Sequence, residues 1–277
     1  MKIDIKHKKN FLICIDSDGC AMNTMDVKHL NYFGPLAAKF FNINDCKTFL
    51  DKWNQINLYS NTRGINRFKG LVLGLQDAIE RGEKIEDISN LIRWTETTKE
   101  LSNSSLELEI EKNKTNDLIK TLEWSQSVNN GIEELVGKDS PFPNVKKHLE
   151  ELHKVANIAV VSSANSQAIY SEWSRHELLN HVDIVFGQEA GTKAICIKKL
   201  KDYGYNNNNI LMIGDAPGDL EAALLNNVFF FPILFGKEEE SWNELTSNAL
   251  NKFINNLYLG EYQNNINNNF KRLLNLK

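Results

Sequence analysis

In the stretch FLICIDSDGC, residues 11–20, a short apolar run ends abruptly in two aspartates and a glycine. A continuous apolar run of this length is typical of a strand that is buried on both faces of a parallel sheet. The sequence therefore predicts a parallel sheet whose first strand is residues 11–15. Comparable runs are residues 158–161 and 210–213, with 183–186 and 228–234 as fourth and fifth members.

Segments with helical periodicity separate these runs. In VKKHLEELHKV, residues 145–155, the apolar residues recur every three to four positions. Residues 194–203 have a similar pattern, and residues 220–225 follow the third long apolar run. This alternation of strands and helices is typical of a doubly wound α/β fold, so we expect a Rossmann-like parallel sheet core.

The alternation is interrupted after the first strand, because residues 26–138 are helical in pattern and contain no convincing strand. The segment GKDSPFP, residues 137–143, is typical of a linker that returns to the α/β part. We expect an α/β core formed by residues 1–25 and 139–277, and an inserted α-helical domain formed by residues 26–138. The helices expected in the insertion are residues 29–41, 46–57, 66–81, 88–101 and 116–129.

The composition is that of an ordinary globular protein, with 42% hydrophobic and 25% charged residues among 277. A net charge of −4 gives no overall field that would attract nucleic acid. No apolar run is long enough to span a membrane, and the first run is too short for a secretion signal. Cys14, Cys20, Cys46 and Cys196 have no metal-binding spacing, so we expect reduced thiols and a cytoplasmic protein.

Two of the predicted strands end in pairs of acidic residues. Asp16 and Asp18 follow the first strand, and Asp215 and Asp219 follow the run LMIG at residues 211–214. Ligands of open α/β folds bind at the carboxyl edge of the sheet, where these acids are expected. Carboxylates that converge there suit a hard cation such as Mg²⁺. Each pair also has a simpler interpretation, which is a solvated turn for DSDG and a helix N-terminal acid for Asp219.

Hydroxyl and ammonium groups are expected at the same edge. Ser162 ends the run IAVV, and Ser163 follows it at the expected start of a helix. A hydroxyl and the first N–H groups of a helix can bind a phosphate, although serine is also an ordinary helix cap. Lys193 follows a glycine-containing loop after the fourth run, so its ammonium could neutralise a phosphate and the nearby carboxylates.

The chain resembles the haloacid dehalogenase superfamily, in its phosphatase-type branch. The resemblance is carried by four motifs in the family's order, which are DSDG, a strand ending in serine, a lysine and GDAPGD. They extend from about residue 11 to residue 219, and the helical insertion resembles the cap that this family carries after its first strand. The chain departs from the family pattern at Cys20, where phosphatase members usually have threonine or valine. It also lacks the proline that often follows the lysine.

The resemblance implies a Mg²⁺-dependent phosphatase that hydrolyses a small phosphorylated metabolite through an aspartyl-phosphate intermediate. Asp16 would be the nucleophile, and Asp18 would protonate the leaving oxygen and then deprotonate the attacking water. The resemblance also implies that the carboxylates of Asp16, Asp215 and Asp219 and the backbone carbonyl of Asp18 bind Mg²⁺. It implies that Ser162, Ser163 and Lys193 bind the phosphate. Having an acid at position 18 separates this chain from dehalogenase members, which lack it.

Substrate specificity is expected to come from the insertion. Arg63 and Arg67 lie in LYSNTRGINRFKG, residues 58–70, where a basic loop could recognise a second anionic group. Arg63 is the preferred contact because it precedes Gly64 in the loop, and Asn23 could also face the substrate. The simpler interpretation of both arginines is a pair of solvated charges at a helix start.

Other functions fit the same motifs. A phosphomutase of the same superfamily would carry the same two aspartates and the same cap position. A non-catalytic phosphate-binding relative would be expected to have lost one of the acids, and none is lost here. A phosphonate-cleaving enzyme would need a cap lysine for a Schiff base, and nothing selects among Lys28, Lys39 and Lys69. The tryptophans Trp53, Trp94, Trp124 and Trp173 are assigned to packing.

Overall fold

The computed structural model describes residues 5, 8–135 and 137–276. The basic segment before residue 8, apart from Ile5, therefore lies outside the described residues. The chain forms two compact units, one made of Met1–Met25 with Gly137–Lys277 and the other of Asp26–Val136. We call these the α/β unit and the helical unit. Among the described residues, no helix is both long enough and apolar enough to cross a membrane.

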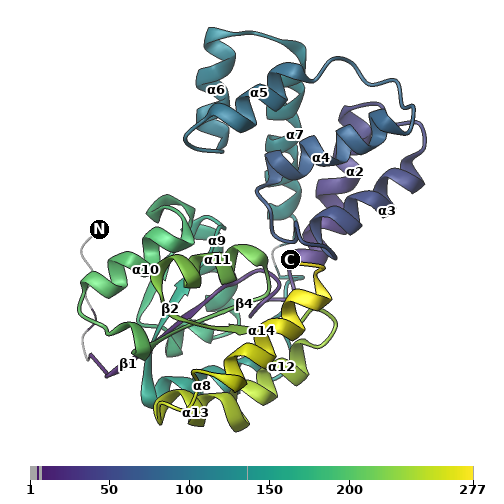
Figure 1. The fold of residues 1–277 in the computed structure, drawn as a ribbon. Coiled ribbons are helices and arrows are strands. Elements are labelled where there is room, and N and C mark those ends of the chain that lie inside the picture. Colours follow the sequence, from purple (N-terminus) through teal and green to yellow (C-terminus); the bar gives the residue numbers. More distant parts are fainter. Residues whose placement is uncertain (1–4, 6–7, 136, 277) are drawn as a thin grey trace. The chain divides into compact units, whose positions relative to one another are not determined.

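The described part of the α/β unit is built on five parallel strands in the order β3-β2-β1-β4-β5 (Figure 1). The strands are β1 (Phe11–Ile15), β2 (Ala156–Val161), β3 (Ile184–Phe186), β4 (Ile210–Gly214) and β5 (Phe229–Pro232). Ile15 at the end of β1 pairs with Val160 on one side and Ile213 on the other. The three central strands therefore end at the same level, and the residues that follow them share one edge of the sheet.

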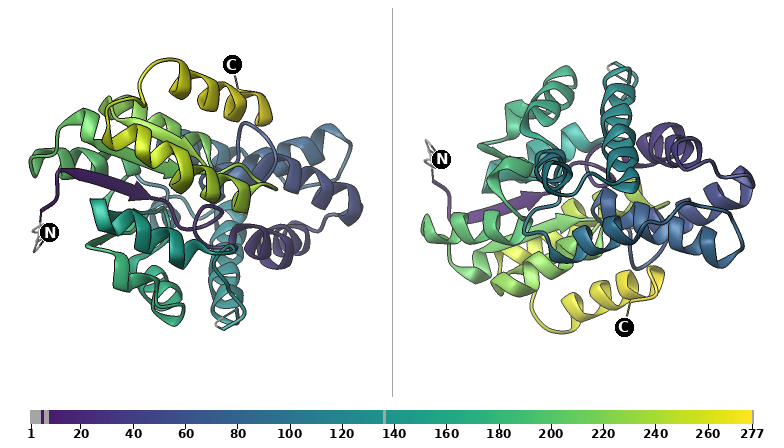
Figure 2. Two further views of the ribbon diagram at one scale, coloured as in Figure 1. Left: turned by 90° about the horizontal axis from the view of Figure 1, so that it is seen from below. Right: turned by 90° about the horizontal axis from the view of Figure 1, so that it is seen from above.

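Helices cover both faces of this sheet because successive strand residues point to opposite sides (Figure 2). Ile13 and Ile15 belong to the cluster packed by α8 (Val145–Val155), α9 (Ser166–Arg175), α12 (Glu238–Glu244) and α13 (Leu250–Ile254). Leu12 and Cys14 belong to the cluster packed by α10 (Lys193–Asp202), α11 (Pro217–Asn226) and α14 (Glu261–Leu273). The predicted α/β fold with a Rossmann-like parallel core is thus confirmed.

Two predicted boundaries in the α/β unit are corrected. Asp183 lies just before β3 and not inside it, because its N–H and its carboxylate both bond the backbone of Ile158 and start the ladder there. α9 begins at Ser166 and not at Ser163. The side chain of Asn165 accepts the N–H of Ala168 at 2.8 Å and is the cap of this helix.

The helical unit has its own hydrophobic core, built around Trp53, Phe68 and Trp124. Its elements are α1 (Met25–Lys28), a π-helical turn (His29–Phe33), α2 (Gly34–Phe40), α3 (Cys46–Asn57), α4 (Arg67–Glu80), α5 (Ser89–Thr97), α6 (Asn103–Lys112) and α7 (Asn116–Glu133). The helix predicted at 88–101 is wrong at its end, because Thr98 is extended and Ser102 caps a separate helix, α6. α6 was not predicted as a separate helix, because Leu106 is its one buried residue and the helical periodicity of its apolar residues is therefore weak.

Candidate active site

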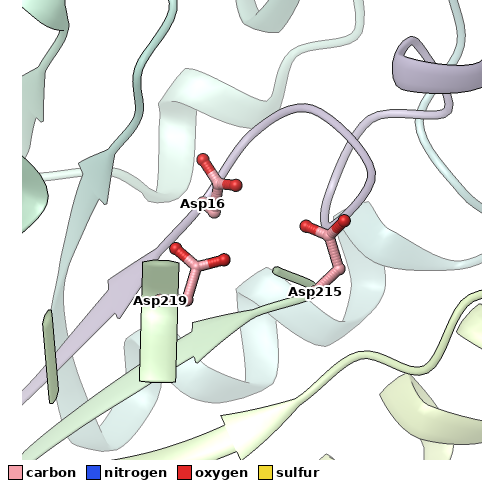
Figure 3. Close-up of side chains that lie close together, drawn as sticks. All are labelled: Asp16, Asp215 and Asp219. Carbon is pink, nitrogen blue, oxygen red and sulfur yellow. The ribbon is translucent and has the colours of Figure 1, made fainter. Parts of the chain in front are cut away.

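Three buried carboxylates meet at the carboxyl edge of the sheet. Asp16 continues β1, and its N–H donates to the carbonyl of Ile213 in β4 at 3.0 Å. Asp215 follows β4 directly, and Asp219 lies in the first turn of α11. One oxygen from each of these aspartates lies within 4.8 Å of the others (Figure 3). The two acidic strand ends that the sequence singled out are therefore brought together.

Gly214 allows Asp219 to enter this cluster. A Cβ atom added to Gly214 would lie 2.2 Å from Cγ of Asp219, which is far inside van der Waals contact. The Asp219 carboxylate also accepts the N–H of Ala216 at 3.0 Å and thereby caps α11. Both interpretations of Asp219 apply at once, because the same side chain caps a helix and lies among the carboxylates.

Lys193 supplies a positive charge inside the cluster. Its Nζ lies 2.8 Å from Oδ2 of Asp16 and 2.5 Å from Oδ1 of Asp219. The lysine is the first residue of α10, where Thr192 accepts the N–H of Ile195 and caps the helix. Burial acts to lower the pKa of Lys193, but the two carboxylates outweigh it and hold the pKa above its ordinary value. The ammonium is therefore a fixed charge at neutral pH.

Burial raises the pKa of Asp16 to about 8, with the charges of Asp219 and Asp215 adding to the increase and that of Lys193 opposing it. Three formal negative charges against one ammonium leave an excess of two, which matches one divalent cation. The ligand atoms are all carboxylate oxygens, the set that Mg²⁺ prefers in proteins. The residues present therefore fit a magnesium ion.

Asp18 lies close to this cluster in sequence, but its carboxylate is not in the group of three among the described residues. Oδ1 of Asp18 accepts a hydrogen bond from the hydroxyl of Thr24, which is 2% exposed. Gly19 adopts φ of 81°, a left-handed conformation that favours glycine, and the chain turns there. Thr24 could not be predicted from the sequence, because no motif marks a threonine six residues after an acid.

Ser162 lies one strand away from Asp16. It directly follows β2, its N–H donates to Phe186 at 3.0 Å, and its hydroxyl accepts the N–H of Ala164 at 3.2 Å. Ser162 is buried, whereas Ser163 is exposed in the bend between β2 and α9. Because α9 begins three residues after Ser163, these serines lie in a bend and not in the first turn of the helix.

The three candidate specificity residues belong to different units of the chain. Asn23 is exposed in the α/β unit, and its N–H donates to Ser140 in the segment that returns from the helical unit. Arg63 belongs to the helical unit, is 3% exposed and donates to the carbonyl of Leu58 at 2.7 Å. The expectation of a solvated charge is therefore wrong for Arg63.

Arg67 is also held within the helical unit. Its guanidinium donates to Asn129 at 2.6 Å and to Ser125 at 3.3 Å, both on α7. The same group lies over the ring of Phe33, 5.1 Å from the ring centre. Arg67 therefore connects α4 to α7, and its side chain is half-buried instead of fully solvated.

Comparison with known proteins identifies the family. The model of the family described as haloacid dehalogenase-like hydrolase matches residues 93–233, just over half of the chain. The match includes Ser162, Lys193, Asp215 and Asp219 and begins after Asp16. No curated protein matches the sequence.

Solved structures of other proteins share the fold. A predicted phosphatase from Clostridium acetobutylicum is 12% identical, with a TM-score of 0.52 and coverage of 88% of this chain and 100% of that one. A candidate β-phosphoglucomutase from Thermotoga maritima is 13% identical, with a TM-score of 0.50 and coverage of 80% and 84%. These structures share the fold, and the family match shows that the chain belongs to the haloacid dehalogenase-like hydrolase family.

Proposed function

We propose that this protein is a magnesium-dependent phosphatase that hydrolyses a small phosphorylated metabolite through an aspartyl-phosphate on Asp16. The observation that carries the proposal is the position of Lys193, whose ammonium bridges Asp16 and Asp219 inside a group of three buried carboxylates. A carboxylate nucleophile needs neighbouring positive charge both to stay ionised and to approach an anionic phosphate. This arrangement supplies that charge beside one carboxylate at a strand end.

In the proposed reaction, an oxygen of Asp16 forms a bond to phosphorus while the bond from phosphorus to the leaving oxygen breaks. Asp18 gives a proton to that leaving oxygen. A water molecule then attacks the aspartyl-phosphate, Asp18 takes the proton of the water, and inorganic phosphate and free Asp16 are released. Thr24 supports this role because its hydroxyl holds one oxygen of the Asp18 carboxylate.

Mg²⁺ would be held by Asp16, Asp215 and Asp219 together with the backbone carbonyl of Asp18, and when bound it would supply positive charge to the transferring phosphate. Lys193 would neutralise a further phosphate oxygen from the side of α10. Ser162 and Ser163 would present a hydroxyl and backbone N–H groups from the bend after β2. All these groups belong to one unit of the protein, which supports a single preformed site.

The proposal extends to the setting of the reaction. The substrate is a small phosphorylated metabolite, as expected for a site whose donors suit one phosphate group. A cytoplasmic location is supported by the four cysteines, all of which are free thiols and three of which are buried.

Purified protein is expected to release inorganic phosphate from 4-nitrophenyl phosphate in the presence of Mg²⁺, with the rate reduced to background by EDTA and restored by added Mg²⁺. A panel of phosphorylated metabolites then ranks substrates by kcat/KM. A phosphomutase would behave differently, because it would need a bisphosphate activator and release little net phosphate. Absence of phosphate release under every one of these conditions would contradict the proposed hydrolase.

We propose that the helical unit acts as a cap domain that selects the substrate, with Arg63, Arg67 and Asn23 as candidate contacts. Arg63 is the preferred candidate because it precedes Gly64, which adopts a φ of 70° in the loop before α4. Arg67 is already bonded to two side chains of α7. These hydrogen bonds indicate that Arg67 also contributes to the stability of the helical unit.

Arg63→Ala is expected to raise KM for the preferred metabolite by about tenfold or more, since loss of a charge-assisted contact costs at least about 1.5 kcal/mol. The rate with 4-nitrophenyl phosphate should change by less than about twofold, because that substrate has no second anionic group. The matched control is Arg81→Ala, which removes a surface arginine paired with Asp77 on the same unit. Equal effects of Arg63→Ala on both substrates would argue against a specificity role.

A further inference from the structure

The loop between Asp16 and Met22 carries both proposed catalytic acids and is tightly folded. The carbonyl of Ser17 accepts the N–H groups of Cys20, Ala21 and Met22 at 3.3, 3.0 and 2.8 Å. These bonds close the loop on itself, but they do not fix it to the rest of the α/β unit. Its position relative to the sheet must come from other contacts.

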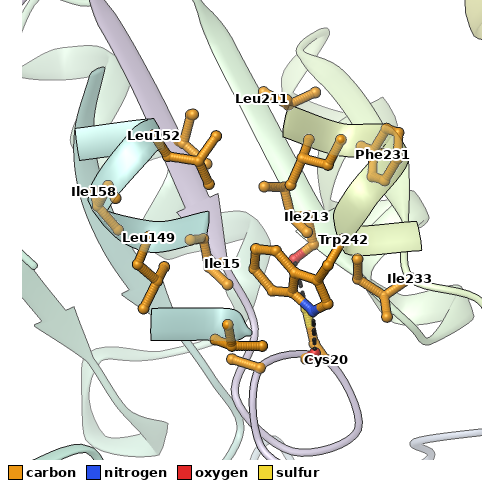
Figure 4. Packing of buried hydrophobic residues seen from close by; sticks show 14 of the residues in the cluster. Ile15, Cys20, Leu149, Leu152, Ile158, Leu211, Ile213, Phe231, Ile233 and Trp242 are labelled. Atoms are coloured by element: carbon orange, nitrogen blue, oxygen red, sulfur yellow. Dashed lines mark hydrogen bonds between the residues drawn. The ribbon is translucent and has the colours of Figure 1, made fainter. Parts of the chain in front are cut away.

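Two tryptophans that are distant in sequence supply such contacts. Nε1 of Trp173, on α9, donates to the hydroxyl of Ser17 at 2.9 Å. Nε1 of Trp242, on α12, donates to the carbonyl of Cys20 at 2.9 Å (Figure 4). All four residues have 0% exposure. Asp18 therefore lies in a short segment whose two sides are each held by an indole N–H group.

The indole of Trp242 is itself fixed by packing. Figure 4 shows the ring among the side chains of the hydrophobic cluster, with its nitrogen directed at the Cys20 carbonyl. The imidazole of His148 stacks on the ring at 5.8 Å, and its Nδ1 lies 3.0 Å from the hydroxyl of Thr246. The Cys20 thiol in turn points at the carbonyl of Ile213, which also accepts the N–H of Asp16.

The physical chemistry of these bonds makes them effective restraints. A buried carbonyl or hydroxyl that loses its partner cannot turn to water, so the loop gains little by moving away from either indole. A tryptophan in a closely packed core has few rotamers available, so the position of its N–H group varies little. Catalytic groups lose much of their efficiency when they move by a fraction of an ångström. Hydrogen bonds that restrain this loop are therefore expected to affect the reaction rate.

We propose that Trp173 and Trp242 are positioning residues that hold the Asp16–Met22 loop, and thereby fix Asp18 relative to Asp16. The proposal rests on the proposed function, in which Asp18 exchanges a proton with the leaving group. The two indole N–H groups donate to Ser17 and to Cys20. Both act through the backbone and the side chain of residues that flank Asp18.

The test compares three substitutions that each remove one buried indole N–H while keeping an aromatic ring. Trp173→Phe and Trp242→Phe remove the two loop contacts. Trp124→Phe is the matched control, because Trp124 is also 0% exposed and donates to the carbonyl of Phe33 at 3.1 Å, but within the helical unit. All three variants should melt a few degrees below the wild type, as expected for the loss of one buried hydrogen bond.

The kinetic result should separate the variants. Trp173→Phe and Trp242→Phe are expected to lower kcat by about tenfold to a hundredfold with KM changed by less than about threefold. The loss in kcat/KM, which reports the step in which the leaving group departs, should be larger with an alkyl phosphate than with 4-nitrophenyl phosphate, because only the alkoxide leaving group needs a proton from Asp18 in that step. Trp124→Phe should stay within about twofold of the wild type on both substrates. Equal losses on the two substrates, or losses no larger than in Trp124→Phe, would overturn the proposal.

A second measurement does not depend on activity. Amide hydrogen exchange in residues 17–22, followed by mass spectrometry, should be at least about tenfold faster in Trp173→Phe and Trp242→Phe than in the wild type or Trp124→Phe. Unchanged exchange in both variants would contradict the positioning role even if the enzyme hydrolyses phosphate. Faster exchange in a protein without phosphatase activity would support the restraint and reject the proposed function.

Discussion

Asp16→Asn is expected to lower phosphate release by at least about a thousandfold, because the amide cannot form the acyl-phosphate bond that the reaction requires. The substitution keeps the shape of a side chain that is 5% exposed and pairs with Lys193 at 2.8 Å. Burial of the ionised carboxylate is unfavourable, as its pKa of about 8 indicates, so the asparagine variant should melt no lower than the wild type without metal. Phosphate release with saturating Mg²⁺ and a melting curve on the same sample provide the measurement.

Two further variants make the result specific. Asp16→Ala should be equally inactive and cannot revert to aspartate by deamidation. Asp183→Asn is the matched control, because Asp183 also adjoins a strand of the same sheet but precedes the first residue of β3. Its carboxylate accepts the N–H of Ile158 and lies 3.3 Å from Nε2 of His153. This variant should lose stability and keep its activity per folded molecule. Activity of Asp16→Asn within tenfold of the wild type would falsify the assignment of the nucleophile.

The positions of the acids could be predicted from the sequence because the information is local. An apolar run that stops at Asp16 or Gly214 defines where a strand ends, and parallel strands bring their ends to one edge. The i, i+4 spacing of Asp215 and Asp219 then returns the second acid to the first, once a helix starts at Pro217. Short-range patterns therefore sufficed for the three carboxylates.

The remaining contacts of the site depend on residues that are far apart in the chain. The donor to Ser17 is 156 residues away, and the donor to Cys20 is 222 residues away. The sequence suggested packing for Trp173, which is correct for its ring but misses its N–H. No periodic pattern marks such a bond, because it depends on how α9 and α12 lie on the sheet.

The start of α9 shows a different limit. Ser162 and Ser163 look like a helix cap, but Asn165 also can cap a helix, and local propensity does not decide between them. In the structure Asn165 is the cap, and the Glu189 carboxylate after β3 accepts both the N–H and the hydroxyl of Ser166. This tertiary contact favours a helix start at Ser166 and is not visible in the local sequence.

The contribution of Asp16 to the stability of the metal-free protein is expected to decrease as the pH rises from about 4 to about 8. The folded state keeps a proton on Asp16 up to its pKa of about 8, whereas the unfolded chain releases it near the ordinary value of 3.8. At this group the folded state therefore binds more protons within this range, and its contribution to the free energy of unfolding decreases with pH by at most about 1.4 kcal/mol per unit. Burial lowers the pKa of His148 and of His181, which acts in the opposite direction, so the measurement is the difference between melting curves of the wild type and Asp16→Asn in EDTA between pH 5 and pH 8. The wild type should lose stability relative to Asp16→Asn as the pH rises.

Mg²⁺ should reverse the trend, because it binds the ionised carboxylates that are unfavourable without it. At a concentration a hundred times its dissociation constant, Mg²⁺ contributes about 2.7 kcal/mol, or a rise in Tm of about 5–10 °C. This rise should be larger at pH 8 than at pH 6, since less proton then competes for Asp16. Sodium chloride at equal ionic strength is the control for general screening.

Asp215→Asn removes one of the three carboxylates and separates metal binding from a general salt effect. Without metal, the variant should be no less stable than the wild type at pH 8, because the charge of Asp215 is one of the causes that raise the pKa of Asp16. With Mg²⁺, its rise in Tm should fall below about 2 °C, since two carboxylates and one ammonium no longer leave an excess charge of two. Asp183→Asn should keep the full rise. An undiminished rise in Asp215→Asn would mean that Mg²⁺ binds elsewhere, because Asp215 lies with Asp16 and Asp219 in the carboxylate group on which the proposed site depends.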